Sequence, residues 1–304
     1  MKRICKLTLA TVVFTLIFTT VGLKAQETDD SDIGLTVGLD YSSNYIYRGE
    51  YYIMGNRYNG SMISPYFFYD VFNTGLSLGM KAEVSEMWFF GNKDEMRGNL
   101  TANIFNSIDF NINYIYSFKK IIKFNIGSWY YRHEKLQDGS NSLDTSYIDF
   151  YFSTTIEALP LEPTFAITYS YYMDENYYKG YDNSGVWGKG SGKNGDLYVQ
   201  LGIGNSYQLV GETYMDLDVM VGFYNKNVYD IRVMDDSNED TKSTDISDID
   251  LSAGLTTKEG ILTLSTSFHY VIVPGTQYKY ALLDSGMTKD IHRFYAKFGV
   301  ACSI

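Results

Sequence analysis

The residues of this 304-residue chain best suited to acid–base chemistry are its three histidines, His133, His269 and His292. A histidine side chain gains and loses a proton near neutral pH, so it can act as a general base. Ser267 and His269 are two residues apart, a spacing that places both side chains on one face of a β-strand. A hydroxyl next to an imidazole is the core of a hydrolase nucleophile. No further motif supports such a site, and we interpret His269 as a hydrogen-bonded polar residue.

Two polar stretches contain the residue types that bind metal ions or phosphate. Residues 235–250 are rich in acids, and calcium prefers such oxygen ligands. The acids in question are Asp235, Asp236, Glu239, Asp240, Asp245 and Asp248. The Asp-x-Asp-x-Asp-Gly spacing of a preformed site does not occur, which favours a solvated external loop. Residues 178–196 are rich in glycine but do not connect a strand to a helix, as a phosphate loop would. We therefore expect no metal and no cofactor.

Apolar and polar residues alternate along most of the chain, and this period of two is typical of a β-strand with different faces. Ile33, Leu35 and Val37, for example, alternate with small or polar residues. Aromatic residues make up 16% of the chain and there are only 4 prolines, a composition that favours strands. About twelve such segments occur, each close to the nine to eleven residues that cross a membrane as a tilted strand. In residues 63–71 both faces are aromatic, so the sequence does not decide which one points outward.

The connections between these segments alternate between short and long. Short ones are expected near residues 73–75, 119–120, 158–163, 210–211 and 258–260, and long ones near 49–59, 88–99, 133–143, 174–195, 225–247 and 274–290. This order is typical of a barrel with short periplasmic turns and long external loops. Backbone groups in hydrocarbon need hydrogen-bond partners, so the sheet must close on itself. The sequence therefore predicts an all-β fold, a closed antiparallel transmembrane β-barrel of about 12 strands with both termini periplasmic.

Residues 1–25 have the features of a cleaved signal peptide. Three basic residues precede an apolar run, and the acidic residues 26–32 follow it. An uncleaved anchor is the alternative, because the run is close to the lower length limit of a membrane-spanning helix. We expect cleavage, a short acidic tail at 26–32 and one barrel domain over 26–304, exported to the cell outer membrane. Cleavage removes Cys5 and leaves Cys302, so no internal disulfide is expected.

If the apolar face of each strand contacts lipid, the polar face lines the interior. The predicted pore-lining residues carry charges of both signs: Asp40, Arg48, Lys81, Glu83, Asp109, Lys123, Asp149, Asp216, Asp218, Asp250, His269, Arg293 and Lys297. We expect Asp216, Asp218 and Asp250 to form a constriction that favours cations. Charges of both signs can line a water-filled passage or can pair and close it, and the sequence leaves both open.

Aromatic residues gather where the predicted strands meet the long loops. Tyrosine and tryptophan prefer the boundary between lipid and water. We therefore expect an aromatic girdle that includes Tyr45, Tyr47, Trp88, Trp129, Tyr130, Tyr171 and Tyr278.

The stretch of residues 40–52 resembles the opening of the TorF-type porins. The residues that match the family pattern are Ser43, Asn44, Tyr45, Tyr47, Arg48 and Gly49. The chain departs from the pattern at Tyr51, where the family usually has serine. The resemblance covers about residues 33–90. It implies an outer-membrane β-barrel, mostly of unassigned substrate, and no catalytic residues.

These patterns predict an outer-membrane channel for passive diffusion of small polar solutes or ions, and not an enzyme. The expected partners are outer-membrane lipids, the barrel-assembly machinery and small polar solutes. Nucleic acid is excluded because the chain has a net charge of −11. The alternative is a plugged barrel that displays surface loops for adhesion or partner binding. A third hypothesis is an enzyme that acts on lipid through His269.

Overall fold

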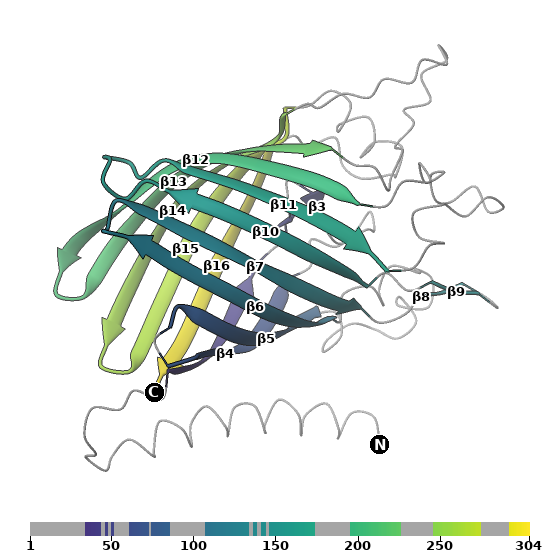
Figure 1. Cartoon of the computed structure of the whole chain (residues 1–304), viewed down its shortest axis with the longest axis horizontal. Coiled ribbons are helices and arrows are strands. Elements are labelled where there is room, and N and C mark those ends of the chain that lie inside the picture. Colours follow the sequence, from purple (N-terminus) through teal and green to yellow (C-terminus); the bar gives the residue numbers. More distant parts are fainter. Residues whose placement is uncertain are drawn as a thin grey trace.

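The computed structural model describes residues 34–43, 46–47, 50–51, 61–72, 74–85, 107–133, 136–138, 141–143, 146–173, 195–225, 246–274 and 292–304. Within these residues, twelve strands form one closed barrel (Figure 1). In chain order they are β1 Leu35–Ser42, β4 Met62–Asp70, β5 Leu76–Ser85, β6 Ser107–Phe118, β7 Ile122–His133, β10 Tyr147–Thr155, β11 Thr164–Tyr172, β12 Asp196–Val210, β13 Thr213–Asn225, β14 Ile246–Glu259, β15 Leu262–Ile272 and β16 His292–Ser303. Two short hairpins lie outside the barrel: β2 Ile46–Tyr47 pairs with β3 Glu50–Tyr51, and β8 Leu136–Asp138 pairs with β9 Asn141–Leu143.

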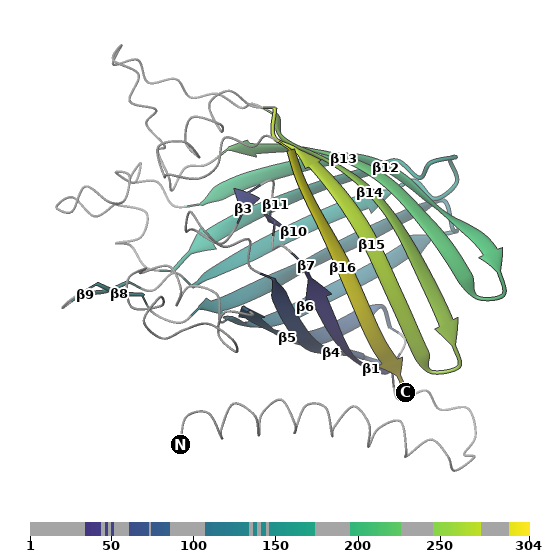
Figure 2. The same ribbon diagram turned by 180° about the vertical axis from the view of Figure 1, so that it is seen from behind.

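Strand β1 closes the barrel, because it pairs with β4 on one side and with the last strand, β16, on the other (Figure 2). Gly38, for instance, is opposite both Tyr66 and Ala301. Every pair of neighbouring strands is antiparallel. A closed sheet has no edge with unpaired N–H and C=O groups, which is the condition for a barrel in hydrocarbon. The predicted fold, a closed antiparallel barrel of about 12 strands, is confirmed.

The connections alternate in length as predicted. Residues 211–212 join β12 to β13, and residues 260–261 join β14 to β15. Gly211 and Gly260 have φ values of 56° and 58°, a left-handed conformation that glycine adopts without steric cost. The other ends of these strands are joined by longer connections, such as residues 226–245 between β13 and β14. Strand β1 begins and β16 ends at the short-turn end, where Leu35 and Ile304 exchange backbone hydrogen bonds of 3.0 and 2.8 Å.

The outward side chains of the strands are mostly apolar. Phe268 and Phe294 are 61% and 69% exposed, far more than apolar side chains of a soluble protein core. Strand β6 presents a continuous outer row of Ile108, Phe110, Ile112, Tyr114, Tyr116 and Phe118. Large exposed apolar surfaces indicate contact with another apolar phase. Within the described residues, no helix is long and apolar enough to cross a membrane.

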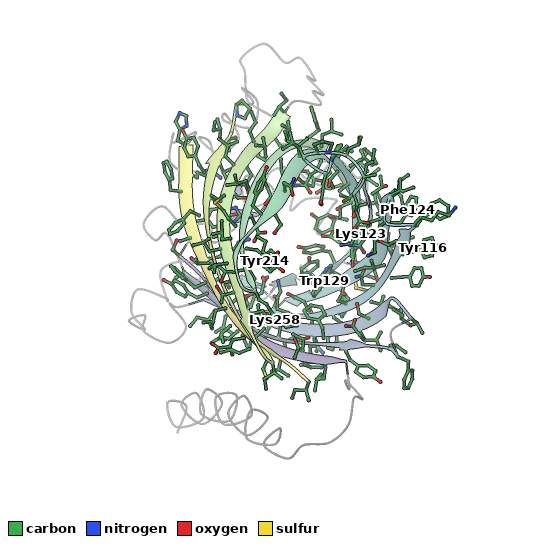
Figure 3. All side chains as sticks on the ribbon, turned by 90° about the vertical axis from the view of Figure 1, so that its left-hand side faces the viewer. Tyr116, Lys123, Phe124, Trp129, Tyr214 and Lys258 are labelled. Atoms are coloured by element: carbon green, nitrogen blue, oxygen red, sulfur yellow. The ribbon has the colours of Figure 1, made fainter. Side chains whose placement is uncertain are left out.

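The inner face carries the polar side chains. Figure 3 shows Tyr116 and Phe124 on the outside of the barrel, whereas Lys123, Trp129 and Tyr214 point inward. The burial of β6 alternates residue by residue over its first half, as expected for a strand with two different faces. The alternation found in the sequence is therefore the alternation between exterior and interior.

Strand β4 is the segment whose two faces are both aromatic, and the structure decides between them. Phe67 points outward and is 40% exposed. Tyr66 and Phe68 point inward and lie flat over Gly38 and Gly79 of the neighbouring strands. A Cβ atom at either glycine would be 2.3 Å from the covering ring, so no larger residue fits there without moving the ring. These glycines allow bulky inward rings to lie against the wall.

Candidate functional site

The barrel interior is the candidate functional site, because most predicted pore-lining residues converge there. The described part of the chain contains twelve of the thirteen predicted residues, and all twelve occupy inward positions of their strands. They are Asp40, Lys81, Glu83, Asp109, Lys123, Asp149, Asp216, Asp218, Asp250, His269, Arg293 and Lys297. Arg48 lies outside the described residues.

Not all of these charges meet the water of the interior. The side chains of Asp109, Asp149 and Arg293 are at most 2% exposed, so they belong to the barrel wall. Asp149 accepts a hydrogen bond from Ser170 of β11. Asp218 of β13 is exposed. The inward charges therefore divide into a buried set and a set whose side chains are exposed to the interior.

Two inward acids were missed because the sequence analysis placed them in loops. Asp196 is the first residue of β12 and accepts a hydrogen bond of 3.0 Å from the Tyr172 hydroxyl. Asp248 lies in β14, where both of its carboxylate oxygens are 3.1 Å from the Tyr198 hydroxyl. The assignments of Asp248 to an external acidic loop and of Asp196 to a glycine-rich loop are wrong. Continuing the period of two backwards along each strand would have found both residues.

A charged cluster occupies the inner face of β5 and β6. Lys81 forms an ion pair with Glu83 and lies 3.9 Å from a carboxylate oxygen of Asp109. Its ammonium group is also 5.5 Å from the centre of the Trp129 ring on β7, a distance at which a cation attracts an aromatic face. The partners on three strands hold the Lys81 side chain against the wall.

A second polar group lies on β13, β14 and β15. Asp216 and Asp218 accept hydrogen bonds from Thr256 and Ser252 of β14 at 3.2 and 3.4 Å. Asp250 is the next inward acid of the same strand pair, opposite Met220. The three aspartates that we predicted to lie together are therefore inward carboxylates on two adjacent strands.

His269 of β15 connects a hydroxyl to a carboxylate. Its Nε2 atom is 3.0 Å from the Ser267 hydroxyl, and its Nδ1 atom is 3.1 Å from Asp250. The ring of Tyr295 stacks on the imidazole with 4.3 Å between centres. This order of hydroxyl, imidazole and carboxylate is the one found in serine hydrolases. All of these side chains face the interior and not the lipid.

Of the other two histidines, the structure describes the side chain of His292 alone, and it does not join this group. His133 lies at the end of β7, and its side chain is outside the described set. His292 is exposed at the start of β16, where its Nδ1 atom is 2.5 Å from the Tyr270 hydroxyl. Within the described residues, no group of three or more His, Cys, Asp or Glu side chains is arranged to hold a metal ion.

The predicted aromatic girdle needs one correction. Tyr130 and Tyr171 point outward, and Tyr130 stacks on Phe110 with 6.3 Å between ring centres. Trp129 points inward instead, since it shares the face of Lys123. The period of two already places Trp129 on the inward face. The girdle prediction relied instead on the clustering of aromatic residues at the strand end. Tyr45, Trp88 and Tyr278, and the side chain of Tyr47, lie outside the described residues.

An aromatic wall covers the interior of β7, β10, β11 and β12. Strand pairing aligns the inward residues in four rows, counted from the long-loop end. The rows are Tyr131–Tyr147–Tyr172, then Trp129–Asp149–Ser170–Asp196, then Gly127–Tyr151–Thr168–Tyr198, and then Asn125–Ser153–Ala166–Gln200. Tyr131, Tyr147 and Tyr172 are buried and packed ring on ring, with 4.6 and 5.3 Å between centres. This wall was not recognised in the sequence.

A cavity of about 440 Å³ lies on this wall. Its lining comes from all four strands: Asn125, Trp129, Tyr131, Asp149, Tyr151, Phe152, Ser153, Ala166, Thr168, Tyr198 and Gln200. The volume falls within the range of roughly 300–1,000 Å³ that is typical of small-molecule sites. The lining combines aromatic rings with amides, hydroxyls and one carboxylate.

Comparison with known proteins gives likenesses of shape only. No protein-family profile and no curated protein sequence matches the chain. A structure of the NanC porin is similar with a TM-score of 0.48 and 11% identity, over 89% of this chain and 100% of that chain. The KdgM porin gives 0.45 and 9%, over 88% and 99%. The translocator domain of the autotransporter NalP from Neisseria meningitidis gives 0.48 and 10%, over 97% and 98%.

Proposed function

We propose that this protein is an outer-membrane channel through which small polar solutes or ions diffuse passively. The observation that carries the proposal is the division of one closed sheet into an apolar outer face and a charged inner face. Lipid accepts the first surface, and water is the natural solvent of the second. A barrel of twelve strands is wider than the side-chain-filled barrel of eight, so its interior has room for water. The short-turn end then faces the periplasm, together with both termini.

The interior of this channel favours cations. Among the described residues, the seven predicted interior acids are joined by Asp196 and Asp248, whereas four predicted bases lie inside. The turn-end positions Asp70 and Lys258 add one charge of each sign. In the described part of the chain, Asp216 and Asp218 accept hydrogen bonds from Thr256 and Ser252, and Asp250 is bonded to His269 and Tyr295, so none of these hydrogen-bond partners is a lysine or arginine. An excess of negative charge along a narrow path raises the local concentration of cations.

The position of His269 weighs against an enzyme that acts on membrane lipid. Ser267 and His269 face the interior, and the outer face of β15 presents Leu264 and Phe268 instead. A lipid acyl chain in the bilayer contacts the outer face and does not reach the pair through the strand. We therefore propose a transport role for this interior and not lipid hydrolysis.

Liposome swelling tests the proposal. The purified full-length chain is reconstituted into liposomes, which are then diluted into solutions of neutral polar solutes of increasing size. Because the path is open and narrow, small solutes should enter and swell the liposomes, and the rate should fall steeply with solute size. Liposomes that resist all solutes, together with partner binding that depends on the long loops, would favour the plugged display barrel instead.

A further inference from the structure

The cavity on the aromatic wall exists because two large side chains of one row lean apart. Tyr151 leans from β10 over Gly127 of β7, and its hydroxyl donates to Asn113 of β6 at 2.9 Å. Tyr198 leans from β12 over Gly222 of β13, and its hydroxyl donates to Asp248 of β14. The two rings thus turn away from β11, which lies between their strands.

The space between the two rings has a floor of small side chains. Ser153, Ala166 and Thr168 occupy the inward positions there, and all three line the cavity. A large residue at any of them would fill the space. The hydrogen bonds that hold the two tyrosines on either side keep the cavity open before any ligand arrives. Such preorganisation lowers the entropy lost on binding.

Trp129 forms the side of the cavity toward the long loops and is also fixed in place. Its ring meets the Phe68 ring edge-on at 6.1 Å, stacks on Tyr131 at 6.0 Å and lies under the Lys81 ammonium group. The Trp129 indole, fixed in this way, offers a flat apolar surface to a molecule in the cavity. Tyr151 and Tyr198 add further aromatic surface to the same cavity.

Polar groups are spaced between these rings. Asn125 and Gln200 stand at the two ends of the fourth row and provide amide donors and acceptors. The side-chain oxygen of Asn125 is buried and has no hydrogen-bond partner within the described part of the chain. A buried polar atom without a hydrogen bond costs free energy unless a ligand or a water molecule bonds to it. Thr168 and Ser153 add hydroxyls, whereas the one carboxylate of the lining, Asp149, is buried in the wall.

We propose that this cavity binds an uncharged saccharide unit of a solute that passes through the channel. A sugar ring has apolar C–H faces that pack on aromatic rings, and hydroxyls around its edge that bond to amides and to other hydroxyls. None of the described lining residues is a lysine or arginine, so the site lacks the groups that bind anionic sugars. Asp149 is 2% exposed and already accepts the Ser170 hydroxyl, which makes it a poor counter-ion for a cation. The inference rests on the proposed channel function, whose solute it names.

Current recordings in planar bilayers test the site with three probes: maltotriose, trigalacturonate as the anionic control and choline as the cationic control. Maltotriose should interrupt the ion current in proportion to its concentration, and the other two should do so weakly. Tyr151→Ala and Asn125→Ala should each raise the half-blocking concentration about tenfold, equivalent to about 1.4 kcal/mol. Tyr214→Ala, an inward tyrosine of β13 outside the cavity lining, is the matched control and should leave it unchanged.

Titration calorimetry of the detergent-solubilised protein with maltotriose separates this inference from the channel proposal. Binding heat without any conductance supports the site and overturns the channel. Conductance with neither maltotriose block nor heat overturns the site and leaves the channel intact. Stronger block by trigalacturonate or choline than by maltotriose overturns the assignment to uncharged sugars. If Tyr151→Ala fails to fold, as judged by its heat-modifiable gel mobility, Gln200→Ala replaces it with the same expected loss.

Discussion

At the scale of single residues, the interior separates charges that build the wall from charges that face water. Asp196 and Asp248 are buried and accept hydrogen bonds from tyrosines of other strands. Asp216 and Asp218 accept hydrogen bonds from hydroxyls of β14 and remain accessible. Sequence parity identifies the inward position of such residues, but it does not distinguish the two roles. The difference depends on which side chains of strands one or two positions away reach them, and the sequence does not show which side chains these are.

The accessible acids should control ion selectivity. Neutralising Asp216, Asp218 and Asp250 together, each to Asn, should lower the ratio of cation to anion permeability by roughly two- to fivefold, because the local negative potential disappears. Reversal potentials under a salt gradient measure this ratio. Glu212→Gln with Glu259→Gln removes acids at the short turns and serves as the control. An unchanged ratio in the triple variant would show that the three aspartates do not set the selectivity.

The buried tyrosine–aspartate pairs should instead control stability. Tyr198→Phe removes the hydroxyl that donates to both oxygens of Asp248, which are buried, and should destabilise the barrel by about 1–3 kcal/mol. Urea unfolding in lipid vesicles measures the change. Tyr207→Phe, on the exposed outer part of β12, should have a much smaller effect. Equal effects of the two substitutions would contradict a structural role for the Tyr198 bond.

At the scale of elements, the alternation of side chains was readable from the sequence because a strand has a strict period of two. It predicted the strands, the outward faces of all of them except β4, and the order of short and long connections. It failed where a long loop joins a strand, at Asp196 and Asp248, because polar residues at strand ends read as loop. The aromatic wall was also missed, since its rows are formed by residues of four strands. Only the register between strands reveals which of them are neighbours.

Glycines on the inner face allow large rings from neighbouring strands to lie flat on the barrel wall. In Gly127→Ala the new Cβ would be 2.4 Å from the Tyr151 hydroxyl oxygen and 2.5 Å from the Ile112 carbonyl oxygen. We expect a loss of about 1–3 kcal/mol in unfolding free energy, as for overpacked sites. Gly254→Ala is the control, because its nearest atom would be 3.2 Å away. Comparable urea midpoints for both variants would show that the Tyr151 ring moves without cost.

At the scale of the whole molecule, one closed sheet produces two surfaces of opposite character. Its exterior is apolar, so lipid is its expected surrounding, and its interior brings acids, hydroxyls and rings from all twelve described barrel strands around a common axis. Closure follows from β1 pairing with both β4 and β16, and this long-range pairing was predicted only through the need to satisfy every backbone group. The channel proposal depends on the interior being continuous from one end to the other.

Single-channel conductance of the purified full-length protein in a planar bilayer tests that continuity directly. Discrete current steps of uniform size, with reversal potentials that favour cations, are the predicted result. A barrel that inserts, as shown by heat-modifiable mobility and protease protection, yet passes no current would contradict the account.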